Sequence, residues 1–552
     1  MNGVQITGLS VSGPSGQVVA AFDAEVAPGG MLAIIGESGS GKTLSAKSLV
    51  GLLPRGFRAR GTMSVDGRTV DLAARHDQWG GVRGRVAALL LQDPFTSLSP
   101  VHRCGDQIAW TIEAARGKRL TRAERTAAVT RALAEVNLPE RVIRAYPHQL
   151  SGGMRQRVAI AAAVASDPLL LIADEPTTAL DASNQAEVLD ALRTLQRTRG
   201  LPIILISHDL GVVRGRADTV LVMRHGDIVE RGNTGEVLRS PQHPYTRALV
   251  EADPVLASTP AAVGDVERDA LVGVRGLGKH FGDRAVLEGV DLDIAAGSIA
   301  GIVGESGSGK STLARCIAGL EREDAGTVTF AGSPLAPGRR SRTPDQMQIV
   351  FQDPYSSLNP MMTVGAILRE ALRAARRGSA QRGSAQRGSA QRGGASSTAT
   401  VSDLLETVGL PEEFAGRRPA DLSGGQRQRV AIARALAPNP RLLICDESVS
   451  ALDVSVQAQI LDLFRQLREQ RGITILFISH DLAVVRTLAD TVTVMWEGRV
   501  VEHGACADVL ERPQHPFTQT LVAAALQENA GAPEAERPEA ETSEAEREAA
   551  DD

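Results

Sequence analysis

The seven-residue sequence GESGSGK occurs at residues 36–42 and again, letter for letter, at residues 304–310. Two further segments recur with nearly the same spacing, LSGG at residues 150 and 422 and ISHDL at residues 206 and 478. Each copy spans about 250 residues, far more than one unit of a solenoid, and is long enough to bury a core of its own. The chain is therefore predicted to be a tandem duplication of one domain.

The repeats and the composition between them predict the domain boundaries. The two domains are expected at residues 1–251 and 270–526, joined by a Pro- and Ala-rich linker at residues 252–269. Three copies of RGSAQ in the second domain predict a flexible, positively charged insertion at residues 377–394. Residues 527–552 contain ten acidic residues and two arginines. Because this segment has few apolar residues to pack, we expect a disordered tail.

The overall composition excludes several classes of protein. Hydrophobic residues make up 43% of the 552 residues and charged residues 23%, which is typical of folded globular proteins. The 60 basic and 65 acidic residues give a formal net charge of -5, which argues against a general nucleic-acid-binding surface. No stretch reaches the roughly 18 apolar residues of a membrane helix, and the N-terminus does not resemble a signal peptide. We expect neither nucleic-acid binding nor direct insertion into a membrane.

Short apolar segments predict the fold class. MLAIIG, LLLIADE and PIILISHD are continuous apolar runs that end in turn residues and precede helix-like stretches. Runs of this kind suit a parallel sheet that is covered on both faces. The expected class is α/β, with a helical insert at residues 111–137 that is rich in Ala, Arg and Glu.

Each copy of GESGSGK has the sequence context of a phosphate-binding P-loop, because it follows an apolar strand and precedes a helix-like run. Glycines let backbone amides approach phosphate oxygens, and the helix N-terminus adds a favourable partial charge. Lys42 and Lys310 would neutralise phosphates, while the hydroxyls of Thr43 and Ser311 are suitable ligands for Mg²⁺. One such loop could be a chance Gly/Ser turn, but two matching loops favour phosphate binding. The candidate residues are Gly36, Glu37, Ser38, Gly39, Ser40, Gly41, Lys42, Thr43, Gly304, Glu305, Ser306, Gly307, Ser308, Gly309, Lys310 and Ser311.

Two acidic residues end an apolar strand in each copy, Asp174-Glu175 in the first and Asp446-Glu447 in the second. The aspartate of such a pair can hold Mg²⁺, and the glutamate can orient or deprotonate an attacking water. Taken alone, either pair is equally compatible with a solvated strand end. Downstream of a P-loop, both pairs are predicted to be Walker B residues of a nucleotide-hydrolysing site.

The LSGG segments open helix-like runs, so their amides and serine hydroxyls could bind a further phosphate or could simply cap a helix. An LSGG signature between a P-loop and a Walker B strand resembles the nucleotide-binding domains of ATP-binding cassette (ABC) proteins, and the resemblance covers essentially the whole chain twice. It implies two P-loop NTPase (ABC-type) nucleotide-binding domains in tandem, each with a helical subdomain. The signature residues are Ser151, Gly152, Gly153, Ser423, Gly424 and Gly425.

The resemblance also implies roles for residues outside these motifs. Family members have a Q-loop glutamine that senses Mg²⁺ and couples to the membrane partner, a switch histidine that contacts the γ-phosphate, and a D-loop aspartate. Their domains close head to tail around two ATP molecules, so each P-loop should face the signature of the other domain. Both predicted sites keep the glutamate and the histidine, which implies that both hydrolyse ATP. The matching residues are Gln92, Gln352, His208, His480, Asp181 and Asp453.

The two predicted sites differ at one aromatic position. Phe281 matches an adenine-stacking residue, whereas Gly13 aligns with it in the first copy. Stacking of a base on an aromatic side chain is worth about 1–3 kcal/mol. The first site is therefore expected to bind ATP more weakly, unless another side chain supplies the contact.

A second resemblance concerns function. HPYTRAL at residues 243–249 and HPFTQTL at residues 515–521 are similar to a C-terminal motif of the dipeptide, oligopeptide and nickel importer ATPases. The duplicated form is similar to the fused ATPases of importers such as the glutathione type. These resemblances imply a peripheral ATPase at the cytoplasmic face of the bacterial cell membrane, with ATP and Mg²⁺ as cofactors. Its implied partners are two transmembrane permease subunits and an extracytoplasmic solute-binding protein.

The alternative is a soluble tandem ABC ATPase that acts on ribosomes or on another cytosolic machine. That function would predict a long, charged, helical arm between the domains, whereas the predicted linker is short. We therefore expect an importer ATPase. Peptide, nickel-chelate and glutathione importers would share every motif named above.

Overall fold

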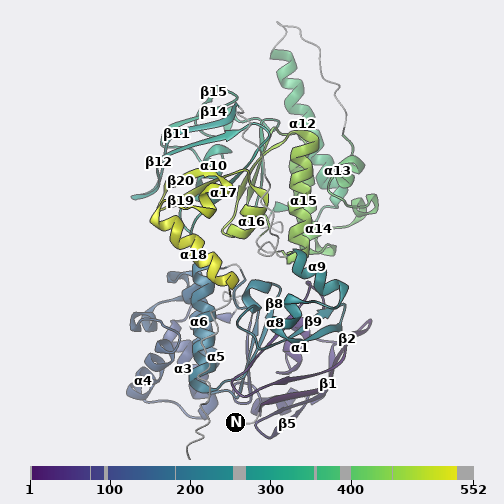
Figure 1. The fold of residues 1–552 in the computed structure, drawn as a ribbon, viewed down its shortest axis with the longest axis vertical. Coiled ribbons are helices and arrows are strands. Elements are labelled where there is room, and N and C mark those ends of the chain that lie inside the picture. The colour runs from purple at the N-terminus through teal and green to yellow at the C-terminus, as the bar shows by residue number, and fades with distance from the viewer. Residues whose placement is uncertain are drawn as a thin grey trace, which may run out of the picture.

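A computed structural model of the chain describes residues 3–74, 76–91, 97–178, 180, 182–252, 269–352, 357–385, 399–449 and 452–530. Residues 3–252 are called the first half below and residues 269–530 the second half. The two halves share one architecture and lie one above the other (Figure 1). Residues 253–268 of the linker predicted at 252–269, part of the predicted insertion and most of the predicted tail lie outside the described residues.

Each half contains ten strands in its described part. In the first half they are β1 (Val4–Gly13), β2 (Gly16–Val26), β3 (Met31–Ile35), β4 (Arg58–Val65), β5 (Arg68–Asp71), β6 (Ala87–Leu90), β7 (Leu170–Asp174), β8 (Ile203–Ser207), β9 (Thr219–Arg224) and β10 (Asp227–Asn233). In the second half they are β11 (Ala270–Phe281), β12 (Arg284–Ala295), β13 (Ile299–Val303), β14 (Ala325–Phe330), β15 (Ser333–Leu335), β16 (Met347–Val350), β17 (Leu442–Asp446), β18 (Thr474–Ile478), β19 (Thr491–Trp496) and β20 (Arg499–Ala505).

The helices also occur in matching sets. The first half has α1 (Lys42–Ser48), α3 (Cys104–Arg116), α4 (Arg122–Ala134), α5 (Gly152–Val164), α6 (Ala182–Arg199), α7 (Leu210–Val213), α8 (Thr234–Arg239) and α9 (Pro244–Ala252). The second half has α10 (Lys310–Ile317), α12 (Val364–Ala385), α13 (Val401–Thr407), α14 (Gly424–Leu436), α15 (Val454–Arg471), α16 (Leu482–Leu488), α17 (Cys506–Glu511) and α18 (Pro516–Ala530).

Both halves repeat the same pair of sheets. The first half has a four-stranded sheet in the order β2-β1-β4-β5 and a six-stranded sheet in the order β10-β9-β3-β8-β7-β6. The second half has β12-β11-β14-β15 and, written in the reverse direction, β16-β17-β18-β13-β19-β20. The four-stranded sheets are antiparallel, and the centre of each six-stranded sheet is parallel. The predicted α/β class and the tandem duplication are confirmed.

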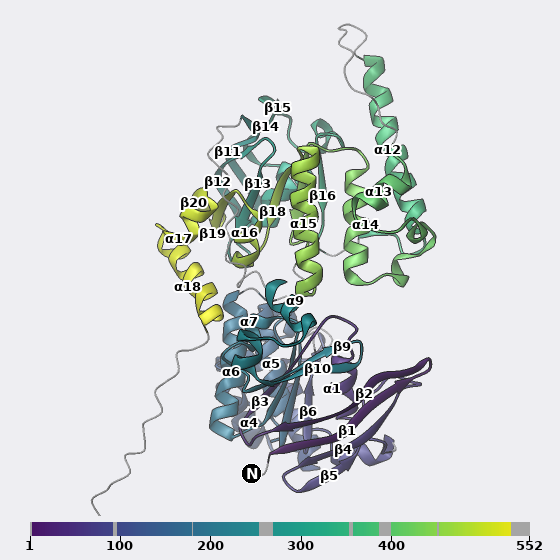
Figure 2. The ribbon, with the colours of Figure 1, turned by 45° about the vertical axis from the view of Figure 1, so that its right-hand side comes forward.

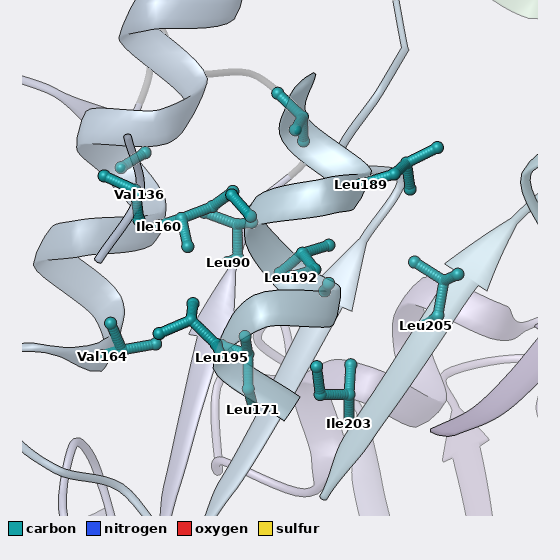
Figure 3. Packing of buried hydrophobic residues seen from close by; sticks show 14 of the residues in the cluster. Leu90, Val136, Ile160, Val164, Leu171, Leu189, Leu192, Leu195, Ile203 and Leu205 are labelled. Carbon is teal, nitrogen blue, oxygen red and sulfur yellow. The ribbon is translucent and has the colours of Figure 1, made fainter. Parts of the chain in front are cut away.

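The parallel strands are buried on both faces, as their continuous apolar sequences predict. In β3, Ala33 and Ile35 join the cluster formed with the helices, whereas Leu32 and Ile34 join the cluster beneath the antiparallel sheet. Successive side chains of a strand point to opposite faces, so one strand contributes to both cores. Figure 3 shows the helix side, where Leu195 of α6 lies near Leu171 of β7.

The helical subdomain of the first half differs in detail from the single insert predicted at residues 111–137. The structure has two helices there, α3 and α4, and α3 begins earlier, at Cys104. Gly117 adopts a left-handed conformation at the end of α3, and Thr121 caps α4 through a reciprocal hydrogen-bond pair with Glu124. A glycine C-cap followed by a capping box interrupts the helix at this point.

Helix α12 extends into the predicted RGSAQ insertion. It is continuous from Val364 to Ala385, so residues 377–385 are helical where an irregular segment was predicted. Four of the five residue types in the repeat are compatible with a helix, and glycine is only one residue in five. Residues 386–398 lie outside the described residues.

The last helix of each half packs against the opposite half. Helix α9 contacts α15 of the second half, and α18 contacts α6 and α7 of the first half. Figure 2 shows α9 beneath α15 and α18 descending towards α6. These two helices begin at the proline of the repeated HPYTRAL and HPFTQTL sequences, so the motif lies at the junction of the halves. Within the described ranges, no helix is long and apolar enough to cross a membrane.

Candidate ATP sites

The first P-loop connects β3 to α1 and is closed around the side chain of Lys42. The buried Lys42 Nζ donates hydrogen bonds to the carbonyl oxygens of Gly36 and Glu37, at 2.6 and 2.9 Å. Gly41 has a φ of 108°, and a Cβ there would lie 2.8 Å from Val19 Cγ2. A side chain at Gly41 would therefore be strained as well as crowded.

The second P-loop repeats this arrangement between β13 and α10. Lys310 Nζ donates to the carbonyl oxygens of Gly304 and Glu305, both at 2.8 Å. Gly304 has a φ of 147°, close to the 148° of Gly36 in the first loop. The repeated sequence therefore folds into the same lysine-centred loop in both halves.

Each P-loop hydroxyl meets the aspartate of its predicted Walker B strand. Thr43 Oγ1 donates to Asp174 Oδ1 at 3.2 Å, and Ser311 Oγ donates to Asp446 Oδ1 at 2.8 Å. Burial, with the charge of Glu175 as the second cause, raises the pKa of Asp174 to about 6. A hydroxyl beside a buried carboxylate offers the hard oxygen ligands that Mg²⁺ prefers.

The register of the parallel sheet brings the catalytic candidates together. Asp174 at the end of β7 pairs with Ile206 of β8, and Ile206 pairs with Ile34 of β3. His208 follows Ile206 by two residues, beyond the end of β8. The P-loop, Walker B and histidine segments therefore leave the sheet at the same edge, where ligands of open α/β sheets bind.

Glu175 is held in a strained conformation beside His208. Its φ is 48°, a left-handed value that is rare for a residue with a side chain, and its N–H donates to Ile206 O at 2.9 Å. His208 Nδ1 lies 3.1 Å from Glu175 Oε1, and Thr178 Oγ1 donates to Glu175 Oε2 at 3.2 Å. Burial opposes ionisation, but the hydrogen bond and the charge of His208 lower the pKa of Glu175. Burial alone would lower the pKa of His208, but the hydrogen bond to Glu175 and its negative charge outweigh burial, so the pKa of His208 is raised.

The second half repeats the pair and adds the Q-loop residue. Glu447 has a φ of 47°, and His480 Nδ1 lies 3.6 Å from Glu447 Oε1. Gln352 Nε2 donates to Glu447 Oε2 at 2.6 Å. The predicted Gln352, Glu447 and His480 therefore lie together. Gln92, the counterpart of Gln352, and Asp181, the counterpart of Asp453, lie outside the described residues.

A cavity of about 660 Å³ lies between the first P-loop and the second half. Burial lowers the pKa of Lys42, and the charge of Asp453, contributed by the second half, opposes this shift. Burial also opposes the charged form of His208, but Glu175, with Asp453 among the other charges, raises its pKa. The first P-loop therefore faces the second signature, in the head-to-tail pairing that the family resemblance implies. The lining residues are Glu37, Ser38, Gly39, Gly41, Lys42, Thr43, Leu44, Glu175, Thr178, His208, Ser423, Gly424, Gly425, Arg427, Leu452, Asp453 and Val456.

Both signature serines cap the helices that follow them. The hydroxyl of Ser151 accepts from Met154 N at 3.2 Å, and that of Ser423 accepts from Gln426 N at 3.3 Å. The helix-cap interpretation is thus correct as local structure. Ser423 nevertheless lines the cavity, so capping and ligand binding are compatible at this residue.

The second glycine of each signature allows a close helix–helix approach. A Cβ at Gly153 would lie 2.2 Å from Asn184 Oδ1 of α6. A Cβ at Gly425 would lie 2.2 Å from Val456 Cγ1 of α15. Glycine at these positions therefore lets the signature helix pack against the helix that follows the Walker B strand.

The aromatic positions of the two sites are related in an unexpected way. Phe281 is 48% exposed at the end of β11, with Lys279 Nζ 5.2 Å from its ring centroid. In the first half, a Cβ at Gly13 would lie only 2.8 Å from Cε1 of Phe57. Phe57 thus occupies the space next to Gly13, and its counterpart 268 residues later is Ala325. Each half has one aromatic residue here: Phe281 ends β11, whereas Phe57 directly precedes β4.

The sequence patterns missed three residues around the first site. Thr178 contacts Glu175, Arg427 lines the cavity, and Tyr245 accepts a hydrogen bond from Glu37 N at 2.9 Å. Threonine and arginine carry no motif signal at these positions. A signal for Tyr245 was present, because the repeated motif reads HPY in the first half and HPF in the second.

Comparison with known families agrees with this geometry. The family described as "ABC transporter" matches residues 19–178 and 287–450, which contain both P-loops, both signatures and both Walker B strands. The chain belongs to the ABC transporter family. As an ABC ATP-binding protein it binds and hydrolyses ATP. A second family, "Oligopeptide/dipeptide transporter, C-terminal region", matches residues 229–284 and 501–550.

This ABC protein is similar to curated proteins over most of its length. It is 42% identical to the glutathione import ATP-binding protein GsiA of Pectobacterium atrosepticum, with 90% of this chain and 84% of the relative covered. It is 40% identical to GsiA of Escherichia coli (strain K12), with the same coverage. Among solved structures, an archaeal ribosome recycling factor, aABCE1 in complex with the stalk protein aP1, matches with 20% identity and a TM-score of 0.59. That match covers 90% of this chain and 88% of the other, and it shows the fold alone.

Proposed function

We propose that this ABC ATPase energises an importer of di- or oligopeptides, or of related small solutes such as glutathione. The observation that carries the proposal is that each half has a C-terminal region of the oligopeptide/dipeptide transporter type. The similarity to glutathione import ATP-binding proteins over 90% of the chain supports it. The proposed partners are two transmembrane permease subunits and an extracytoplasmic solute-binding protein, with the ATPase peripheral on the cytoplasmic face of the bacterial cell membrane.

Exposed apolar side chains support a docking role for both halves. Among the described residues, seven large hydrophobic side chains are exposed, and four of them form two equivalent pairs. Val101 and Met361 are 72% and 75% exposed and are 260 residues apart, the spacing of Gln92 and Gln352. Leu52 and Leu320 are 268 residues apart, the spacing of the P-loops. Single exposed apolar residues are ordinary, but the same exposure at equivalent positions favours one shared type of partner.

The residues of each loop fit ATP and Mg²⁺. The buried hydroxyls of Ser40 and Ser308 find no hydrogen-bond partner among the described residues, as expected of groups placed for phosphate oxygens. Lys42 is buried inside its loop, so its charge is available at short range to a phosphate. We propose that Thr43 and Asp174, with Gln92, hold Mg²⁺ in the first site, and that Ser311, Asp446 and Gln352 do so in the second. The metal would neutralise charge on the phosphates.

The proposed mechanism follows from the position of each group. Glu175 and Glu447 orient and deprotonate the water that attacks the γ-phosphorus, and the bond to the β–γ bridging oxygen breaks. His208 and His480 hold these carboxylates and contact the γ-phosphate. The backbone and serine of each signature complete the phosphate site from the opposite half. ATP binding would therefore close the halves, and hydrolysis would release them.

The proposal is tested by isolating partners from gently solubilised membranes of the source bacterium, with an epitope tag on the chain and mass spectrometry of the bound proteins. Two polytopic permeases are expected, and they should be lost when Val101 and Met361 are both changed to Asp. Thr69→Asp, at an exposed position of β5 outside both pairs, provides the control and should keep the permeases. Recovery of ribosomal proteins without permeases would contradict the importer function and favour a ribosome-associated ATPase.

A further inference from the structure

Tyr245 connects the C-terminal motif of the first half to the P-loop of the same half. Its hydroxyl accepts a hydrogen bond from Glu37 N at 2.9 Å, and its side chain is buried, with 5% of the residue exposed. Glu37 directly follows Gly36, at the entrance of the loop. The loop amide therefore has a buried partner that comes from a segment about 200 residues away in sequence.

The aromatic ring is held from several sides. His243 Nδ1 accepts from Tyr245 N at 3.1 Å, so the turn before α9 is closed by its own histidine. The carboxylate of Glu230 in β10 accepts from Gln242 N at 2.8 Å and from His243 N at 3.0 Å. The guanidinium of Arg224, at the end of β9, lies 4.8 Å from the centre of the tyrosine ring. Tyr245 is thus fixed to the six-stranded sheet and does not depend on the loop for its position.

The second half keeps the turn and loses the hydroxyl. The carboxylate of Glu502 accepts from Gln514 N at 2.9 Å and from His515 N at 3.0 Å, as Glu230 does in the first half. His515 Nδ1 likewise accepts from Phe517 N at 3.2 Å. Phe517 occupies the place of Tyr245 and stacks on Trp496, with ring centroids 5.5 Å apart. The two halves therefore differ in the side chain that packs on this ring, which is Arg224 in the first half and Trp496 in the second. Phe517 also has no oxygen that could accept a hydrogen bond from Glu305 N.

Tyr245 also lies near the point where the halves meet. Its helix, α9, contacts α15 of the second half, and Asp453 precedes α15 as its N-cap. Burial raises the pKa of Tyr245 to about 12, and the charge of Asp453 adds a smaller contribution in the same direction. Asp453 also acts on Lys42 and His208. Tyr245, the first P-loop and Asp453 of the opposite half therefore lie close together.

We infer that Tyr245 is a positioning residue for the first ATP site and that the second site works without a counterpart. The inference rests on the proposed binding of ATP phosphates by the loop of residues 36–43. By holding Glu37 N, the hydroxyl keeps the loop entrance in one conformation before ATP arrives. A loop that is already ordered loses less conformational entropy on binding, so its affinity is higher. The hydroxyl therefore makes the two ATP sites inequivalent.

The test separates the two sites by removing one P-loop lysine at a time. Lys310→Ala leaves the first site as the binding site for ATP with Mg²⁺, and Lys42→Ala leaves the second. Tyr245→Phe, which removes only the hydroxyl, is added to each background, and the Kd for ATP is measured by calorimetry. In the Lys310→Ala background the Kd should rise about threefold to tenfold, the range expected for one lost hydrogen bond. In the Lys42→Ala background the Kd should stay unchanged.

The comparison of backgrounds distinguishes positioning from general stability. If the hydroxyl only stabilised the fold, Tyr245→Phe would lower the melting temperature without a selective change in Kd at the first site. An unchanged Kd in the Lys310→Ala background would overturn the inference and leave the proposed function intact. If the Lys310→Ala protein did not bind ATP while the Lys42→Ala protein did, the assignment of the first site itself would be wrong.

Discussion

His208 Nδ1 lies 3.1 Å from Oε1 of Glu175, and the backbone of Glu175 is held at a φ of 48°. The strained conformation is fixed by the hydrogen bond from Glu175 N to Ile206 O and by the contact from Thr178 to the carboxylate. The second half repeats the strain at Glu447, with a φ of 47°. Strain that persists in both copies is typical of a functional position, where the surrounding structure determines the conformation. This backbone conformation directs the carboxylates of Glu175 and Glu447 towards the histidine and the P-loop of their own half.

The first prediction concerns these carboxylates in hydrolysis. Glu175→Gln and Glu447→Gln keep the size of the side chain and remove the base, so the double variant should lose ATP hydrolysis by about 10²–10⁴-fold. Steady-state phosphate release measures the loss, and the Kd for ATP should change little. The control is Glu236→Gln, which makes the same change at a glutamate outside both sites. Full activity in the double variant would show that neither glutamate takes part in hydrolysis.

The second prediction is a pH dependence of stability from the pair of Glu175 and His208. The pKa of His208 is raised above its ordinary value of 6.5, so its stabilising contribution is complete below pH 6.5 and is lost as pH rises through the raised pKa. The pKa of Glu175 is lowered below its ordinary value of 4.5, so its contribution is present above pH 4.5 and is lost as pH falls through the lowered pKa. The pair should therefore stabilise the fold most between pH 4.5 and 6.5.

This window is checked with the melting temperature of His208→Gln against the unchanged protein. The difference should be largest near pH 6 and smaller near pH 9. His148→Gln, outside the pair of Glu175 and His208, should show no such pH profile. A difference for His208→Gln that grew steadily towards pH 9 would contradict an ion pair between the two side chains.

The third prediction concerns the second glycine of the signature. Gly425→Ala places a Cβ 2.2 Å from Val456 Cγ1, whereas Gly424→Ala meets only Leu452 Cδ2, at 3.8 Å. Overpacking of this kind typically costs about 1–3 kcal/mol. Urea unfolding should therefore show a lower free energy of unfolding for Gly425→Ala than for Gly424→Ala. Val456→Ala should restore part of the loss, and equal stabilities of the two alanine variants would mean that the close approach is unimportant.

Sequence patterns predicted most of the fold and most of the residues that line the cavity at the first P-loop, because exact repeats identify motifs that are local. GESGSGK, with a strand before it and a helix after it, determines the loop around Lys42 without help from distant residues. The contact from Tyr245 to Glu37 joins segments 208 residues apart, and no spacing rule predicts it. The division of the predicted helical insert depended on Gly117 and on the capping box at Thr121, whose signals are short. Long-range packing therefore accounts for what the patterns missed.

The fourth prediction concerns adenine binding, for which the sequence alignment of Gly13 with Phe281 implied a weaker first site. In the structure the ring of Phe57 fills the space beside Gly13, so the first half has an aromatic surface supplied by a neighbouring segment. If Phe57 stacks on the adenine, Phe57→Ala in the Lys310→Ala background should weaken ATP binding by about 1–3 kcal/mol, or roughly 5- to 150-fold in Kd. Phe281→Ala in the Lys42→Ala background should do the same at the second site. Tripolyphosphate, which has no base, should bind the alanine variants as well as their parents. A loss of tripolyphosphate binding would instead mean that Phe57 supports the shape of the P-loop, and an unchanged Kd for ATP would leave the first site without an aromatic contact.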